Sequence, residues 1–128
     1  MFVNGTPVIE IVLSNPLLSV KFPESGSVLA VIDTGYEGFA VVPQDIFKKL
    51  RLDELSQHKR ALTLPTERLI ESTGSYARII IPELKTFRDG FVETTDGVDE
   101  IVLGTEFLEG FKLVLDYCTR SFEISSCW

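Results

Sequence analysis

Short apolar runs separated by turn-forming residues limit the fold of this chain more than any other feature of its sequence. The runs are rich in β-branched and aromatic residues, as β-strands are. Turn signals such as Asn15-Pro16 and Pro23-Glu24-Ser25-Gly26 stand between them. Many short strands at close spacing favour an all-β domain that is closed, or nearly closed, into a barrel. The expected strands cover residues 8–13, 17–22, 28–32, 39–42, 87–93, 100–103, 112–117 and 121–124.

One or two short helices are expected beside the strands. Pro43 suits the first turn of a helix, because the N–H that proline lacks would have no partner there. Ile46, Phe47 and Leu50 follow at helical spacing, which predicts a helix over residues 44–52. A second helix is expected over residues 104–108. The length of 128 residues corresponds to one domain, spanning residues 1–128.

Composition and charge argue against some classes of binding partner for this chain. The hydrophobic share of 45% is that of a folded globular protein. A net charge of -7 argues against a nucleic-acid surface, which needs clustered Lys and Arg. No apolar run approaches the roughly 18 residues that span a bilayer, and the N-terminal segment lacks the pattern of a signal peptide. We therefore expect a cytoplasmic protein without nucleic-acid or membrane partners.

The residues that usually mark other chemistries are sparse. Cys118 and Cys127 indicate two buried or free thiols rather than a disulfide framework, although a single bridge stays open. His58 is the only histidine and lies in a polar stretch, so neither a Ser-His-Asp triad, a Cys-His pair nor a zinc site is marked. The acidic residues at 96, 99 and 100 indicate a solvated loop. We expect no metal and no cofactor.

The chemistry concentrates at Asp33-Thr34-Gly35, directly after the apolar run 28–32. That run is expected to form a strand buried on both faces. The tripeptide alone fits a tight Asx-type turn, but Asn or Ser would serve such a turn equally well. A carboxylate at the end of a buried strand is unfavourable unless it is hydrogen-bonded, paired or used. The position therefore favours a functional carboxylate.

A second motif, over residues 101–108, consists of an apolar strand, Gly104 and a short amphipathic turn. Alone it indicates a strand that runs into a helix, with Gly104 allowing close backbone approach. Together the two motifs resemble those of the retropepsin-type aspartic proteases, and most closely the small single-domain predicted proteases of bacteria and archaea. Tyr36, Gly38, Phe39 and Pro43 repeat the aromatic, second glycine and proline-ended strand of those proteins. The resemblance covers about residues 28–124.

The resemblance implies the acid-protease fold, a retropepsin-like closed β-barrel, with Asp33 as the catalytic residue. Two carboxylates about 3 Å apart cannot both ionise, so they share one proton and act as base and acid. The chain holds one Asp-Thr-Gly, so the pair requires a homodimer in which Asp33 occurs on both sides of the axis. In the family, the threonine holds the two loops together, as Thr34 would here. Gly35 would let the backbones approach closely.

A long hairpin is expected over residues 60–81, with arms at 61–64 and 76–81 and a polar middle. It lies where the family carries its flap. The resemblance implies a peptide or protein substrate and an interface built from residues 121–128. The implied substrate-binding residues of the flap and groove are Tyr36, Leu64, Pro65, Thr66 and Glu67.

Two functions follow from this sequence. The first is an aspartic endopeptidase that hydrolyses peptide bonds with a water activated by two Asp33 carboxylates. The alternative is a non-catalytic dimeric peptide-binding or assembly module on the same fold, which would hold an extended peptide as an added strand. The intact Asp-Thr-Gly favours the endopeptidase.

Overall fold

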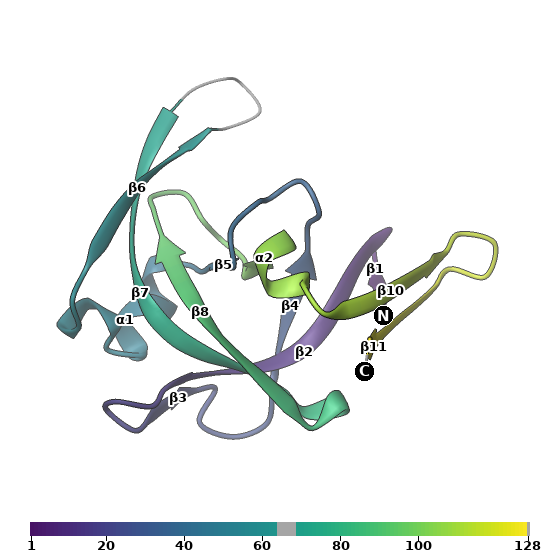
Figure 1. Ribbon diagram of the computed structural model, residues 1–128, viewed down its shortest axis with the longest axis horizontal. Helices are drawn as coiled ribbons and strands as arrows, with labels where there is room; N and C mark the ends of the chain where they lie inside the picture. The colour runs from purple at the N-terminus through teal and green to yellow at the C-terminus, as the bar shows by residue number, and fades with distance from the viewer. Residues whose placement is uncertain (64–68, 128) are drawn as a thin grey trace.

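The structure is a computed structural model that describes residues 1–63 and 69–127 (Figure 1). It is mostly β-sheet with two short helices, as the sequence predicts. The strands are β1 (Phe2–Val3), β2 (Thr6–Asn15), β3 (Val20–Phe22), β4 (Val28–Ile32), β5 (Ala40–Val41), β6 (His58–Thr63), β7 (Leu69–Ile81), β8 (Thr86–Thr94), β9 (Val102–Leu103), β10 (Phe111–Asp116) and β11 (Ser121–Ser126). The helices are α1 (Gln44–Lys49) and α2 (Thr105–Leu108), with 3-10 turns at Leu52–Glu54 and Pro82–Leu84.

Most strands belong to one sheet with the order β1-β2-β4-β9-β5-β8-β7-β6. The long strand β2 also pairs with β3, and through Val12 and Ile80 it pairs with β7. Most pairs are antiparallel, but β4 runs parallel to β9 and β5 runs parallel to β8. The short strand β9 therefore lies between two strands that are adjacent along the chain, β4 and β5. This arrangement brings the two sequence motifs together.

The remaining strands, β10 and β11, form a separate two-stranded antiparallel sheet. This hairpin projects from the body of the molecule at the right of Figure 1. Its inner side chains join the hydrophobic core, because Ile124 is buried there and Phe111, Leu113 and Phe122 pack against it.

The core is formed by alternate residues of the long strands and by both helices. Ile9, Ile11 and Leu13 of β2 are buried at every second position, the period of a half-buried strand. Phe107 of α2 is fully buried and contacts Phe39 edge to face, with ring centroids 5.6 Å apart. Each such fully buried apolar side chain contributes about 1.5–3 kcal/mol. Burial of Phe107 fixes α2 against the sheet.

Two local expectations prove wrong in detail. The strand β4 is not buried on both faces, since Leu29 is 45% exposed and only Ala30 and Ile32 are buried. Its core-facing residues alternate with outward ones, so its continuous apolar run does not mean two covered faces. The helix α1 ends at Lys49 rather than at residue 52, because Arg51 adopts a left-handed backbone with φ of 57°.

The hairpin has a different register from the expected one. The strand β6 pairs with the first half of β7, from His58 opposite Gly74 to Thr63 opposite Leu69. The expected second arm, residues 76–81, instead pairs with β8. The reason is that β7 is one strand of 13 residues that serves both the hairpin and the main sheet. The expected substrate-binding residues Leu64, Pro65, Thr66 and Glu67 lie outside the described residues.

Both cysteines are free and exposed, so the expectation of buried or free thiols rather than a disulfide is confirmed. Among the helices of the described residues, none is long and apolar enough to cross a membrane.

Candidate active site

Asp33 lies directly after β4, in a tight turn at the surface. Its backbone N–H donates to the carbonyl oxygen of Leu103 at 2.9 Å. Its side-chain Oδ1 accepts a hydrogen bond from the Gly35 N–H at 2.8 Å, and its carbonyl accepts one from the Tyr36 N–H at 3.1 Å. The Asx-type turn is therefore present, and the carboxylate it holds is exposed to solvent. Thr34 and Gly35, beside it, are exposed as well.

The two motifs meet because β9 lies against both β4 and β5. Ile32 pairs with Leu103 on one side of β9, and Ala40 pairs with Leu103 on the other. The loop of residues 33–39 spans from β4 to β5, across the end of β9. Three successive amides at the start of α2, those of residues 104–106, donate to loop carbonyls at 2.9–3.2 Å. The start of α2 thus fixes the path of the Asp33 loop.

Gly104 is required for this close approach. A Cβ atom at this position would collide with the carbonyl oxygens of Gly38 and Tyr36. Both are backbone atoms, which cannot move aside as the end of a flexible side chain can. The sequence-based prediction that Gly104 permits close backbone approach is confirmed.

A buried acidic residue, Glu93 at the end of β8, lies behind the loop. Its side chain is fully buried. Arg60 donates from Nε to both carboxylate oxygens of Glu93, at 2.8 and 3.0 Å. The hydroxyls of Ser72 and Tyr36 donate to one oxygen each. Because a buried carboxylate is strongly unfavourable without partners, these donors are what permits its burial.

Tyr36 connects this cluster to the Asp33 loop. Burial, followed by the hydrogen bond to Glu93 and its charge, raises the pKa of Tyr36 well above its ordinary value. The hydrogen bond to Glu93 also raises the pKa of Arg60. Tyr36 therefore remains a neutral donor and Arg60 a cation at any physiological pH. The sequence resemblance assigned Tyr36 to a substrate groove, whereas in the structure its hydroxyl binds Glu93.

Glu93, Arg60 and Ser72 were missed by the sequence analysis. Glu93 was expected as the last residue of a strand, where an acidic side chain normally faces solvent. Its neighbours in the sequence, Val92 and Thr94, give no signal that the side chain between them is buried. The donors come from segments far away in sequence, so no local pattern marks them.

The remaining titratable residues that the sequence analysis considered form no metal site in the part of the chain that the structure describes. No group of three His, Cys, Asp or Glu side chains is placed to hold a metal ion among residues 1–63 and 69–127. His58 is exposed, as expected. The acidic residues at 96, 99 and 100 are exposed too, and Asp96 accepts a hydrogen bond from Gln44 at 2.9 Å.

The arrangement offers the exposed carboxylate of Asp33 on a loop that the backbone fixes at several points, and Glu37 of the same loop is exposed as well. Such a group can act as a general base or acid when a substrate lies against it. No protein family and no solved structure matches this chain.

Proposed function

We propose that this chain is an aspartic endopeptidase that works as a homodimer, with one Asp33 from each copy in a shared active site. The observation that carries the proposal is the placement of Asp33. Its carboxylate is exposed at the end of β4, on a loop held by Leu103 and by the start of α2. The loop is therefore rigid and its carboxylate is accessible, which is what a paired catalytic group requires.

Peptide hydrolysis by water needs a base that activates the water and an acid that protonates the carbonyl oxygen and the leaving amine. Two facing Asp33 carboxylates that share one proton supply both. The ionised carboxylate takes a proton from the water as its oxygen attacks the scissile carbonyl carbon. The protonated one donates to the carbonyl oxygen, which gives a tetrahedral intermediate with two hydroxyls. The C–N bond then breaks as the amine takes a proton from one carboxyl of the pair, while a hydroxyl of the intermediate returns its proton to the other and the carbonyl re-forms. Thr34 and Gly35, exposed beside Asp33, are the residues that meet the partner loop.

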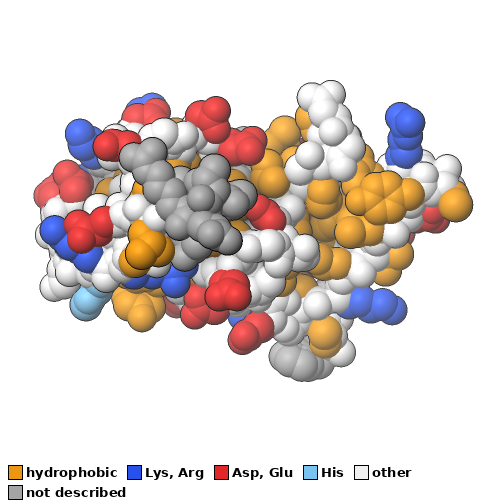
Figure 2. Space-filling model, turned by 90° about the horizontal axis from the view of Figure 1, so that it is seen from above, with side chains coloured by type: hydrophobic (Ala, Val, Ile, Leu, Met, Phe, Trp, Pro, Cys, Tyr) orange, Lys and Arg blue, Asp and Glu red, His pale blue; other side chains and the backbone are white. Residues whose placement is uncertain are grey.

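An apolar surface at one end of the molecule supports the dimer. Figure 2 shows hydrophobic side chains gathered over the end that carries β10 and β11. Phe2 contacts Tyr117 there, with ring centroids 5.7 Å apart, and Tyr117 is 71% exposed. A hollow of about 580 Å³ lies in this region, lined by Phe2, Asn4, Gly5, Tyr117 and Arg120. A second copy that covered this surface would bury aromatic side chains, which dominate interface energetics.

The pairing of the strands supports a retropepsin-like barrel. The path β2, β4, β9, β5, β8, β7 returns to β2, because β2 pairs with both β4 and β7. In Figure 1 the Asp33 loop stands between the hairpin of β6 and β7 and the β10–β11 sheet. The hairpin is in position to cover a peptide that lies across the Asp33 loops. Two exposed free cysteines fit a reducing compartment such as the cytoplasm.

The test compares three variants of the chain on a mixed peptide library at pH 4–7. Wild type is expected to cleave, and Asp33→Asn is expected to lose all cleavage while its fold and dimer persist. The substitution is nearly isosteric and removes both carboxylates of the pair. Asp99→Asn, the same substitution at an exposed position away from the loop, is the control and should cleave like wild type.

An inhibitor with a hydroxyl in place of the scissile carbonyl should block the reaction, since it mimics the tetrahedral intermediate. The dimer of Asp33→Asn should be as stable as that of wild type or more so, because repulsion between facing carboxylates is removed. Full activity of Asp33→Asn would exclude the mechanism, and its unfolding would mean that Asp33 has a structural role.

One observation favours the alternative of a non-catalytic peptide-binding or assembly module. The strand β6 ends the order of the main sheet, so within the described residues its outer edge pairs with no strand. An extended peptide could add to such an edge through backbone hydrogen bonds. Peptides that bind wild type and Asp33→Asn equally, without being cut by either, would establish this alternative.

A further inference from the structure

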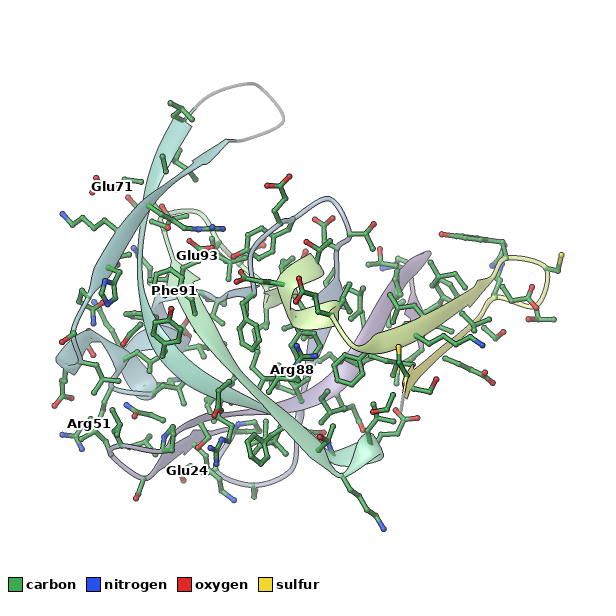
Figure 3. All side chains as sticks on the ribbon, in the orientation of Figure 1. Glu24, Arg51, Glu71, Arg88, Phe91 and Glu93 are labelled. Atoms are coloured by element: carbon green, nitrogen blue, oxygen red, sulfur yellow. The ribbon has the colours of Figure 1, made fainter. Side chains whose placement is uncertain are left out.

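The carboxylate of Glu93 binds three donors from three segments of the chain. Figure 3 shows Glu93 near the end of β8, between the hairpin and the loop after β4. Tyr36 reaches it from the Asp33 loop, Arg60 from β6 and Ser72 from β7. One fully buried group thus connects the loop that carries Asp33 with both strands of the hairpin.

The two hairpin donors lie at the same level of the hairpin. Arg60 and Ser72 are directly opposite each other in the pairing of β6 with β7. Both of their side chains bind the same carboxylate oxygen, Oε1, while Tyr36 binds Oε2. The hairpin is therefore held on both of its strands at this pair, and the described residues 61–63 and 69–71 lie beyond the attachment.

The loop side of the connection is equally direct. Tyr36 binds Glu93 through its hydroxyl, and its backbone N–H donates to the Asp33 carbonyl at 3.1 Å. The Tyr36 hydroxyl and the Arg60 guanidinium also converge on Gly38, where a Cβ atom would collide with both. A displacement of the hairpin base would therefore strain the loop that holds Asp33.

We propose that Glu93 is a positioning residue that couples the hairpin to the Asp33 loop, so that the two segments order together. The coupling is a property of the fold and is measured without a substrate. Its consequence for catalysis rests on the proposed peptidase function. If the hairpin covers the substrate, the Glu93 cluster sets where it lies relative to the Asp33 carboxylate.

Amide hydrogen exchange tests the coupling with two variants that each remove one hydroxyl. Tyr36→Phe removes the hydrogen bond between the Asp33 loop and Glu93. It is expected to speed exchange at least threefold in β6 and in residues 69–74. Ser72→Ala removes the hydrogen bond between β7 and Glu93. It is expected to speed exchange at least threefold at the Gly35 and Tyr36 amides. In the double variant, the increase in each segment should be smaller than the product of the single increases.

The control is Asp89→Asn, which breaks the exposed ion pair of Arg78 and Asp89 on β7 and β8. It should change exchange in neither segment, and in every variant exchange of the β2 amides, which reports global unfolding, should rise by a smaller factor than exchange in the two segments. Effects confined to the segment that carries each substitution, or single increases that multiply in the double variant, would overturn the coupling. A uniform increase throughout the chain, β2 included, would show a merely structural role and overturn it too.

Peptide cleavage separates this inference from the proposed function. Tyr36→Phe and Glu93→Gln are expected to lower kcat/KM at least tenfold without moving the pH profile, since both leave Asp33 in place. If Glu93→Gln fails to fold, Tyr36→Phe carries the test. Absence of cleavage in wild type would refute the peptidase while the exchange result still decides the coupling. Wild-type kcat/KM in Tyr36→Phe would overturn the catalytic consequence.

Discussion

The backbone N–H of Asp33 donates a hydrogen bond to the carbonyl oxygen of Leu103 at 2.9 Å. The bond joins the ends of two parallel strands, β4 and β9, whose residues are far apart in the sequence. It also joins the two motifs on which the proposed function depends. Their contact makes the position of Asp33 sensitive to substitutions in the second motif, at and after Gly104.

Gly104→Ala is expected to lower the free energy of unfolding by roughly 3 kcal/mol, the upper end of overpacking effects. The added Cβ would meet the carbonyl oxygens of Gly38 and Tyr36, so the Asp33 loop must move. Urea denaturation measures the loss, and faster amide exchange at Asp33 and Gly35 localises it. Gly97→Ala is the control, because its Cβ meets no atom within 4 Å and only its left-handed backbone is strained. A stable Gly104→Ala with an unchanged loop would contradict the packing.

Tyr117→Asp is expected to raise the dissociation constant of the homodimer at least tenfold, which corresponds to a loss of about 1.4 kcal/mol of binding free energy. Tyr117 is 71% exposed, and its aromatic contact among the described residues is Phe2. Tyr76→Asp is a matched control, since Tyr76 is 65% exposed and its aromatic contact within the described part of the chain is Phe91. Sedimentation velocity over a range of concentrations measures both. Equal association of the two variants would place the interface elsewhere, and a monomeric wild type would refute the dimer.

Glu93→Ala is expected to lower the free energy of unfolding by about 3 kcal/mol, the lower end of the loss for a buried ion pair, because the Arg60 side chain is 39% exposed and stays partly solvated. The loss leaves Arg60 without its carboxylate and opens a cavity. Asp89→Ala breaks an exposed pair with Arg78 and should cost less than about 1 kcal/mol. Chemical denaturation of both variants gives the comparison. Similar losses would show that the Glu93 cluster contributes no more than a surface ion pair.

Tyr36→Phe is expected to be less stable than wild type by an amount that shrinks at high pH. The pKa of Tyr36 is raised in the folded state by burial and by Glu93, whereas the unfolded chain has the ordinary tyrosine pKa of about 10. The stabilising contribution is thus complete below about pH 10 and is lost as the pH rises beyond it, because only the unfolded state then releases the proton. Urea titrations at pH 7 and pH 11 measure the difference. A difference that stays constant or grows would contradict burial of a protonated Tyr36.

Local patterns in the sequence predicted most elements of the fold. The expected bounds of β4 agree with the structure, and the short helix after Gly104 is present as α2. Turn residues, apolar runs and proline positions act within a few residues, so they can be interpreted without knowledge of the fold. The same holds for the exposed turn at Asp33, whose Gly35 N–H binds the carboxylate two residues away.

Local patterns did not predict the strand pairing of the hairpin or the burial of Glu93. The sequence predicted the two apolar arms but paired the wrong ones, because β7 is long enough to serve β6 with one half and β8 with the other. Which half pairs with which strand depends on the main sheet, where residues of β7 such as Ile79 and Ile81 must face the core. An acidic residue in a strand cannot be recognised as buried until its donors are in place.

Local sequence patterns were sufficient to predict most of the strands and turns, and to place Asp33 at the end of one strand. These depend on backbone preferences and on hydrophobic periodicity, which act between neighbours in the chain. The position of β9 between β4 and β5 follows from long-range contacts, as does the convergence of Tyr36, Arg60 and Ser72 on Glu93. These contacts join residues far apart in the chain, and they form only when the whole sheet satisfies its hydrogen bonds and buries its core together.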